Sequence, residues 1–241
     1  MDEIFFFMAA FLAEIMGTMA GFGSSTIFLP LALFFVDLPT ALILVAFFHV
    51  FGNLSRVTFF RQSINIKLIL LFGVPSVILT VIGAYLVPFI SQEILKFILG
   101  ISLIILSLFK PDLKFPATVN VSILGGSISG FLAGLIGTGG ALRGAFLMSF
   151  NLKKSQYIAT AAIIALAVDL TRIPIYFSEG FLEPNFYFFL PILFLISVAG
   201  SYIGKKIVNK IPQKYFKKFV LNIIILISLK FIYDGFYMLF N

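Results

Sequence analysis

Two short stretches of the sequence combine glycine with small hydroxyl residues inside otherwise apolar runs. The first reads AGFGSSTI over residues 20–27, and the second reads AGLIGTGGA over residues 133–141. Glycine weakens a helix interior, and a short apolar run follows each stretch, so both predict a helix break and a new helix start. The N–H groups of a first helical turn have no partner within the helix and carry the positive end of its dipole, an arrangement that binds anions. The two stretches therefore predict one shared anion site.

The predicted ligands come from the two breaks and from one cation just beyond the second. Glycine lets the backbone approach a ligand closely, and serine and threonine add hydroxyl donors. Arg143 follows the second break by one turn; it either contacts the anion or extends to the membrane interface, and both interpretations stay open. The predicted substrate-binding residues are Gly23, Ser24, Ser25, Thr26, Gly137, Thr138, Gly139, Gly140 and Arg143.

Polar residues in other apolar segments are secondary candidates. They are Glu14, His49, Asn53, Arg56, Asp169 and Arg172. Glu14 is expected to be protonated or paired, and it is a candidate proton carrier. Arg172 follows Asp169 by three residues, so the two are expected to neutralise each other. We expect Arg56 to extend to the cytoplasmic interface, and His49 to bond a neighbouring hydroxyl or carbonyl.

The composition is that of a membrane protein. Of the 241 residues, 61% are hydrophobic and only 11% are charged, whereas soluble domains carry about 25% charged residues. The net charge of +7 comes from lysines in short loops. The positive-inside rule and anionic lipid headgroups account for these lysines, so the charge does not indicate a nucleic-acid partner. The chain has no cysteine and one histidine, so neither a metal site nor a cofactor is expected. No nucleophile with a base is evident, and an enzyme is the least favoured class.

Apolar segments follow one another along the whole chain. They run approximately over residues 4–21, 24–36, 38–60, 67–89, 93–109, 117–136, 139–150, 155–177, 184–204 and 219–240. The segments 24–36 and 139–150 directly follow the two breaks. At about 1.5 Å per residue they are too short to cross a hydrocarbon core of about 30 Å. Each half is therefore expected to contain a helical hairpin that enters the membrane, turns at the glycines and leaves on the side it entered.

The two halves repeat one pattern in the same order. GTMAG at 17–21 matches GFLAG at 130–134, NLSRV at 53–57 matches DLTRI at 169–173, VIGAYL at 81–86 matches VAGSYI at 198–203, and Pro75 matches Pro191. Loops at equivalent positions carry opposite charge, which indicates that the halves are inserted upside down relative to each other. The predicted fold is an all-α polytopic membrane protein of two inverted repeats, residues 1–114 and 115–241. Each repeat has a broken hairpin and three transmembrane helices.

Loop charge also predicts the orientation. Basic residues gather in four loops, at Arg61 and Lys67, at Lys110 and Lys114, at Lys153 and Lys154, and between 205 and 218. If each hairpin leaves on its own side, these loops share one face of the membrane. The positive-inside rule places that face in the cytoplasm and both termini outside the cytoplasm.

The duplicated break followed by a short apolar arm resembles the TauE/SafE family of sulfite exporters over nearly the whole chain. The residues that carry the resemblance are GFGSSTIFLPLA at 21–32 and GLIGTGGALRGAFL at 134–147. The resemblance implies a secondary transporter of the cell inner membrane that moves sulfite, thiosulfate or organosulfonates. An anion channel with the same site is the alternative. Whether a proton or another ion is coupled to transport stays open. The chain departs from the family pattern at Ser24, Ser25 and Thr26, and at Arg143 and Gly144.

Overall fold

A computed structural model describes residues 2–20, 23–60, 64–108, 116–207 and 213–240. Every regular element in these ranges is helical, as predicted. The α-helices are α1 (Asp2–Ala20), α2 (Ser25–Ala32), α3 (Leu38–Phe60), α4 (Ile66–Leu68), α5 (Val74–Leu86), α6 (Gln92–Leu108), α7 (Val119–Ile136), α8 (Gly140–Met148), α9 (Lys154–Ser178), α10 (Phe189–Ile207) and α11 (Gln213–Phe240). The π-helix η1 (Ile69–Gly73) joins α4 to α5, and η2 (Val87–Phe89) and η3 (Pro184–Phe186) are short 3-10 helices.

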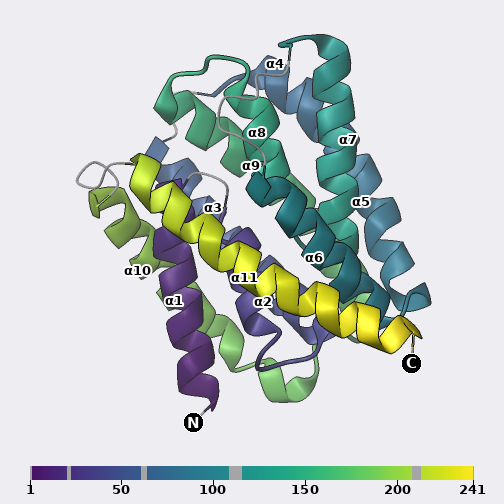
Figure 1. Ribbon diagram of the computed structural model, residues 1–241. Coiled ribbons are helices and arrows are strands. Elements are labelled where there is room, and N and C mark those ends of the chain that lie inside the picture. The colour runs from purple at the N-terminus through teal and green to yellow at the C-terminus, as the bar shows by residue number, and fades with distance from the viewer. Residues whose placement is uncertain (1, 21–22, 61–63, 109–115, 208–212, 241) are drawn as a thin grey trace.

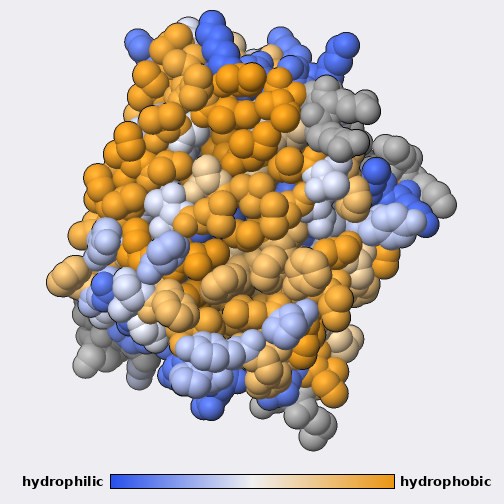
Figure 2. All heavy atoms as spheres, turned by 180° about the vertical axis from the view of Figure 1, so that it is seen from behind, coloured by the Kyte–Doolittle hydropathy of each residue, from blue (hydrophilic) through white to orange (hydrophobic). Residues whose placement is uncertain are grey.

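The helices are those of a polytopic membrane protein. Within the described ranges, five helical stretches are long and apolar enough to cross a membrane: 38–59, 66–89, 119–136, 155–178 and 184–207. Figure 2 shows a broad hydrophobic surface, with most hydrophilic residues toward its upper and lower edges. Large apolar side chains such as Ile78, Leu195 and Leu226 are exposed on the surface of the molecule. Such a surface suits contact with lipid.

Both predicted helix breaks are present. The first lies between α1 and α2, where Gly23 has φ +85°, and the second lies between α7 and α8, where Gly137 has φ +72°. These left-handed conformations favour glycine, because a side chain would meet the following carbonyl. The returning helices α2 and α8 have 8 and 9 residues and contact each other. The predicted hairpins therefore bring their tips together inside the molecule.

Small residues pack the longer helices closely. A Cβ built at Gly130 of α7 would lie 2.1 Å from the backbone oxygen of Ser76 on α5, so the two helices approach almost to backbone contact. The hydroxyls of Ser76 and Thr80 donate across this contact to the oxygens of Gly126 and Gly130, each at 2.9 Å. Gly130 therefore allows close packing of α7 against α5.

The helices of the two halves are interleaved. α1 packs against α10, and α7 packs against α5; α3 packs against α9, and α6 against α11. The sequence repeat predicts that α1 corresponds to α7 and α5 to α10. On this correspondence the contact of α1 with α10 is equivalent to that of α7 with α5, and the contacts α3–α9 and α6–α11 each join two equivalent helices. The start of α1 and the end of α11 both lie toward the lower side of Figure 1. The inverted insertion of the halves stays a prediction, and the predicted boundary between residues 114 and 115 falls outside the described residues.

An apolar core fills one side of the molecule beside the hairpin tips. It joins the first halves of α1 and α3, the helix α2 and the last turns of α9. Phe6, Phe28, Leu42, Phe48 and Tyr176 are among its fully buried members. This core lies on the side where α3 begins and α9 ends. The polar residues of the cavity described below lie on the other side of the tips.

Candidate functional site

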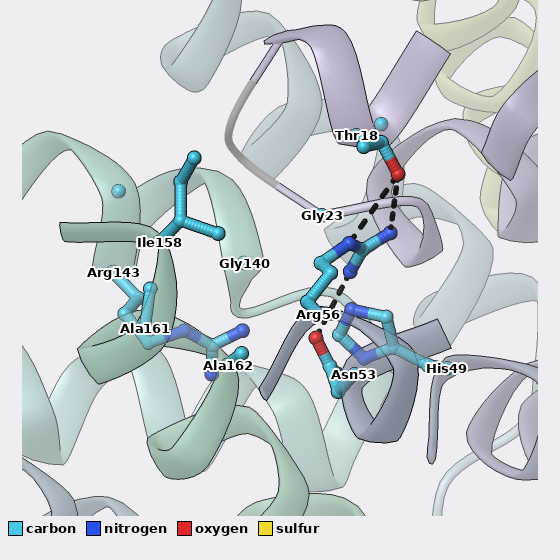
Figure 3. A pocket seen from close by; sticks show the side chains of 12 residues that line it. Thr18, Gly23, His49, Asn53, Arg56, Gly140, Arg143, Ile158, Ala161 and Ala162 are labelled. Atoms are coloured by element: carbon cyan, nitrogen blue, oxygen red, sulfur yellow. Dashed lines mark hydrogen bonds between the residues drawn. The ribbon is translucent and has the colours of Figure 1, made fainter. Parts of the chain in front are cut away.

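A small cavity lies where the end of α1, the middle of α3, the start of α8 and the first half of α9 meet. Its volume is about 30 Å³, enough for one or two water molecules. It is lined by Gly17, Thr18, Gly23, His49, Asn53, Arg56, Gly140, Arg143, Gly144, Ile158, Ala161 and Ala162. In Figure 3, Arg143 reaches the cavity from the side of α8, and His49, Asn53 and Arg56 face it from α3.

Arg143 is a buried cation without a bonded partner in the described part of the chain. Its side chain is 5% exposed and lines the cavity. No hydrogen bond or ion pair joins its guanidinium to any residue of the described ranges, although Tyr157 and Asp169 are near enough to act on it electrostatically. The interpretation that Arg143 extends to the membrane interface is wrong, because the side chain ends inside the protein.

Arg56 is held by an ion pair that ties three helices together. Its Nη2 donates to Oε1 of Glu14 on α1 at 2.5 Å, and its Nη1 donates to Oδ1 of Asn53 at 2.9 Å. The same Glu14 oxygen accepts from the hydroxyl of Ser201 on α10 at 2.6 Å. The expectation that Arg56 extends to the interface is therefore wrong, since Glu14 supplies a buried partner. The expectation that Glu14 is protonated or paired is met by this pairing.

Asp169 joins the cavity to the end of α7. Its Oδ1 accepts from Nη2 and Nε of Arg172 at 2.7 and 2.9 Å, which confirms the predicted neutralisation. Its Oδ2 lies 2.7 Å from Nδ1 of His49. Arg172 also donates through Nη1 to the backbone oxygen of Ala133 at 2.9 Å, so it stabilises the last turn of α7. The partner of His49 is a carboxylate from the other half, and the expected hydroxyl or carbonyl is wrong.

Several buried polar atoms near the tips have no hydrogen-bond partner within the described ranges. They are Nε2 of His49, Nδ2 of Asn53, Oγ1 of Thr138 and Oε2 of Glu14. Nε2 of His49 faces the first break, because a Cβ built at Gly23 would lie 3.0 Å from it. Buried polar groups usually find partners, and since His49 and Asn53 line the cavity, their unpaired nitrogens indicate room for a ligand there.

The predicted binding residues divide into two groups. Gly23, Gly140 and Arg143 line the cavity. The others lie in or beside the breaks without lining it, and Ser24, Ser25, Thr26 and Thr138 are buried there. Gly139 has a packing role, because a Cβ there would lie 2.1 Å from the backbone oxygen of Ser129 on α7. The structure therefore narrows the candidate site to the part of the tips that faces α3 and α9.

Sequence reasoning missed several residues of the site. Thr18, Ile158, Ala161 and Ala162 line the cavity without having been predicted. Thr18 is a hydroxyl residue one position after Gly17, and the alanines belong to a small-residue run, ATAAIIALA at 159–167. Tyr176, whose hydroxyl donates to the backbone oxygen of Gly134 at 2.5 Å, was also missed. A search for small and hydroxyl residues on helices beside the breaks would have found Thr18, Ala161 and Ala162.

Comparisons with known proteins agree with this architecture. A family model described as sulfite exporter TauE/SafE matches residues 6–231. The chain is 27% identical over 237 aligned positions to a probable membrane transporter protein of Methanocaldococcus jannaschii, covering 87% of this chain and 88% of that protein. No solved structure matches the chain.

Proposed function

The chain belongs to the sulfite exporter TauE/SafE family, and from this membership we propose that it carries small sulfur-containing anions across the cell membrane. The family consists of membrane transporters and is not a class of enzymes. The anion sits in the cavity between the two breaks, and alternating access carries it from one side of the membrane to the other. Sulfite, thiosulfate and organosulfonates are the proposed substrate class.

The observation that carries the proposal is the unpaired charge of Arg143. Glu14 pairs with Arg56, and Asp169 pairs with Arg172. Arg143 is left as one positive charge, buried and facing the cavity. A buried charge that lacks its partner costs about 3–5 kcal/mol. A bound anion with one negative charge removes that cost, so the pattern of charges favours an anionic ligand.

Neutral donors complete the proposed site. α8 begins at Gly140, which lines the cavity, and the free N–H groups and dipole of a helix start favour negative charge. Nδ2 of Asn53, a residue that lines the cavity, adds a donor that is not used elsewhere in the described ranges. Such groups bind an anion without holding it as tightly as several charges would. Release on the far side then stays fast enough for turnover.

The position of the cavity supports alternating access. It contacts α3 between His49 and Arg56 and contacts α9 between Ile158 and Ala162. It therefore lies toward the surface where α3 ends and α9 begins, the surface predicted to be cytoplasmic. The opposite side is closed by the apolar core around Phe28, Leu42 and Phe48. We assign the structure to a state that is closed to the outside and too contracted to hold an oxoanion.

The test is a binding screen followed by a flux measurement. Purified protein is titrated by calorimetry with sulfite, thiosulfate, sulfate, methanesulfonate and acetate, and the sulfur-containing anions that bind are tested in proteoliposomes. Saturable exchange of labelled anion supports the transporter. Flux that follows voltage without saturation or exchange supports the channel instead. Absence of binding by every anion would contradict the proposed site.

A further inference from the structure

His49 has one ring nitrogen committed and one free. Nδ1 lies 2.7 Å from Oδ2 of Asp169, and Nε2 has no partner in the described ranges. The side chain is 3% exposed and lines the same cavity as Arg143. Its Nε2 faces the first break at Gly23. The imidazole therefore presents its second nitrogen to the position proposed for the anion.

The bond to Asp169 determines what Nε2 can do. A carboxylate accepts only, so Nδ1 carries the proton of this hydrogen bond. In the neutral ring Nε2 is then an acceptor, and its lone pair would face an anion oxygen unfavourably. When Nε2 is protonated it becomes a charged donor, and its bond to an anion is of the stronger, charge-assisted kind. Anion and proton are thus expected to favour each other at this ring.

The charged groups around His49 define how much negative charge the cavity accepts. Asp169 and Arg172 of α9 form one neutral pair, and Glu14 of α1 with Arg56 of α3 forms another. Arg143 of α8 adds one positive charge, and α2 has no titratable residue in its sequence STIFLPLA. With a neutral His49 the site therefore balances a monoanion. With a protonated His49 it balances a dianion.

We infer that His49 takes up one proton when the site binds a dianion such as thiosulfate, and stays neutral when the site binds a monoanion such as methanesulfonate. The proton comes from water on the side to which the cavity opens and is added to Nε2, which donates it to an anion oxygen. Nδ1 keeps its hydrogen bond to Asp169, and no other bond changes. This inference rests on the proposed function, and it names the proton as the coupling ion for dianionic substrates.

The single histidine of the chain makes the test direct. Protein labelled with ¹⁵N-histidine gives one imidazole, whose nitrogen shifts in NMR distinguish the neutral from the protonated ring. Spectra are recorded at about pH 7.5, above the ordinary titration range of histidine. We expect a neutral ring alone and with saturating methanesulfonate, and a protonated ring with saturating thiosulfate. A ring that is protonated without anion, or that stays neutral with thiosulfate bound, would overturn the inference.

Affinity gives an independent measurement. One proton taken up per anion weakens thiosulfate binding about tenfold for each pH unit above the titration of His49. Methanesulfonate affinity is expected to stay constant over the same range. His49→Gln should remove the pH dependence of thiosulfate affinity. Lys230→Gln, which removes an exposed cation of α11, should keep it. A slope that survives in His49→Gln contradicts the inference, whereas failure of both anions to bind wild-type protein contradicts the proposed function.

Discussion

Arg143 differs from the other buried arginines in where its guanidinium ends. Arg56 and Arg172 each meet a carboxylate, whereas Arg143 ends at the cavity wall. The equivalent position in the first half is Leu29, an apolar residue buried in the core. The positive charge is therefore present on one tip only. The proposed site is asymmetric even though the breaks that form it are repeated.

Replacing Arg143 with glutamine tests this charge. Arg143→Gln keeps polar atoms at the position but removes the cation, so we expect the dissociation constant for thiosulfate to rise about 10- to 100-fold, the usual range for a charged hydrogen bond. Arg143→Lys should lose less affinity for thiosulfate, because the positive charge stays. Calorimetric titration measures both, with Lys230→Gln as a surface control. An unchanged affinity in Arg143→Gln would remove Arg143 from the site.

At the scale of residues, the sequence identified polar groups that are buried in the structure, but only one of their pairings. A charged residue within an apolar segment is costly, so Glu14, Asp169 and Arg172 stood out without any structure. The pair Asp169–Arg172 was predictable because its members share one helix face. The contact of His49 with Asp169 joins residues 120 positions apart. Nothing in local spacing indicates such a contact, because it depends on how α3 and α9 pack.

At the scale of elements, the helix breaks were predictable because each has a local cause. Glycine at Gly23 and Gly137 permits the left-handed turn, and the apolar runs after them are too short to span the membrane. The sequence did not show which glycines allow a ligand to approach and which allow helices to pack. Gly139 was expected to face a ligand, yet it lies against Ser129. A glycine that allows a ligand to approach and one that allows a helix to approach look the same in sequence.

The contact between α5 and α7 gives a prediction in which two effects have opposite signs. In an isolated helix, Gly130→Ala is favourable by about 1 kcal/mol. In the folded protein the new methyl would lie 2.1 Å from the backbone oxygen of Ser76. We expect packing to dominate and destabilise the protein by about 1–3 kcal/mol, seen as a lower Tm in detergent. Leu124→Ala, at an exposed position of the same helix, is the control, and a raised Tm in Gly130→Ala would contradict the close packing.

At the scale of the whole molecule, the cavity lies off centre, between an apolar core on one side and the ends of α3 and α8 on the other. The sequence predicted the helices, and loop charge predicted their orientation. It did not predict that α1 packs on α10 or α7 on α5. Apolar surfaces in a membrane are alike, and the choice of neighbours depends on small residues and on pairs of polar groups from both halves.

The absence of cysteine from the sequence allows the access of the cavity to be measured directly. Ala161→Cys places a thiol on the cavity wall, and we expect a charged thiol reagent to label it from the cytoplasmic side. Saturating thiosulfate should protect it, because the anion would occupy the same space. Labelling is followed by mass spectrometry in right-side-out and inverted vesicles.

Two further positions serve as references for this measurement. Leu42→Cys lies in the apolar core and should resist the reagent from both sides. Glu183→Cys, at an exposed position between α9 and α10, should react from outside the cell. Labelling of Ala161→Cys from the outside only would show that the cavity opens in the other direction, and labelling of Glu183→Cys from the cytoplasm only would reverse the predicted orientation.

The carboxylate of Asp169 connects the surroundings of the two helix breaks. One of its oxygens contacts His49, beside the first break, and the other contacts Arg172, which also donates to the carbonyl of Ala133 in the last turn of α7 before the second break. A proton taken up by His49 would strengthen its attraction to this carboxylate, while the ion pair between Asp169 and Arg172 stays in place. One carboxylate therefore links the ring that takes up the proton to the helix turn before the second break, so a single polar network reaches both hairpins.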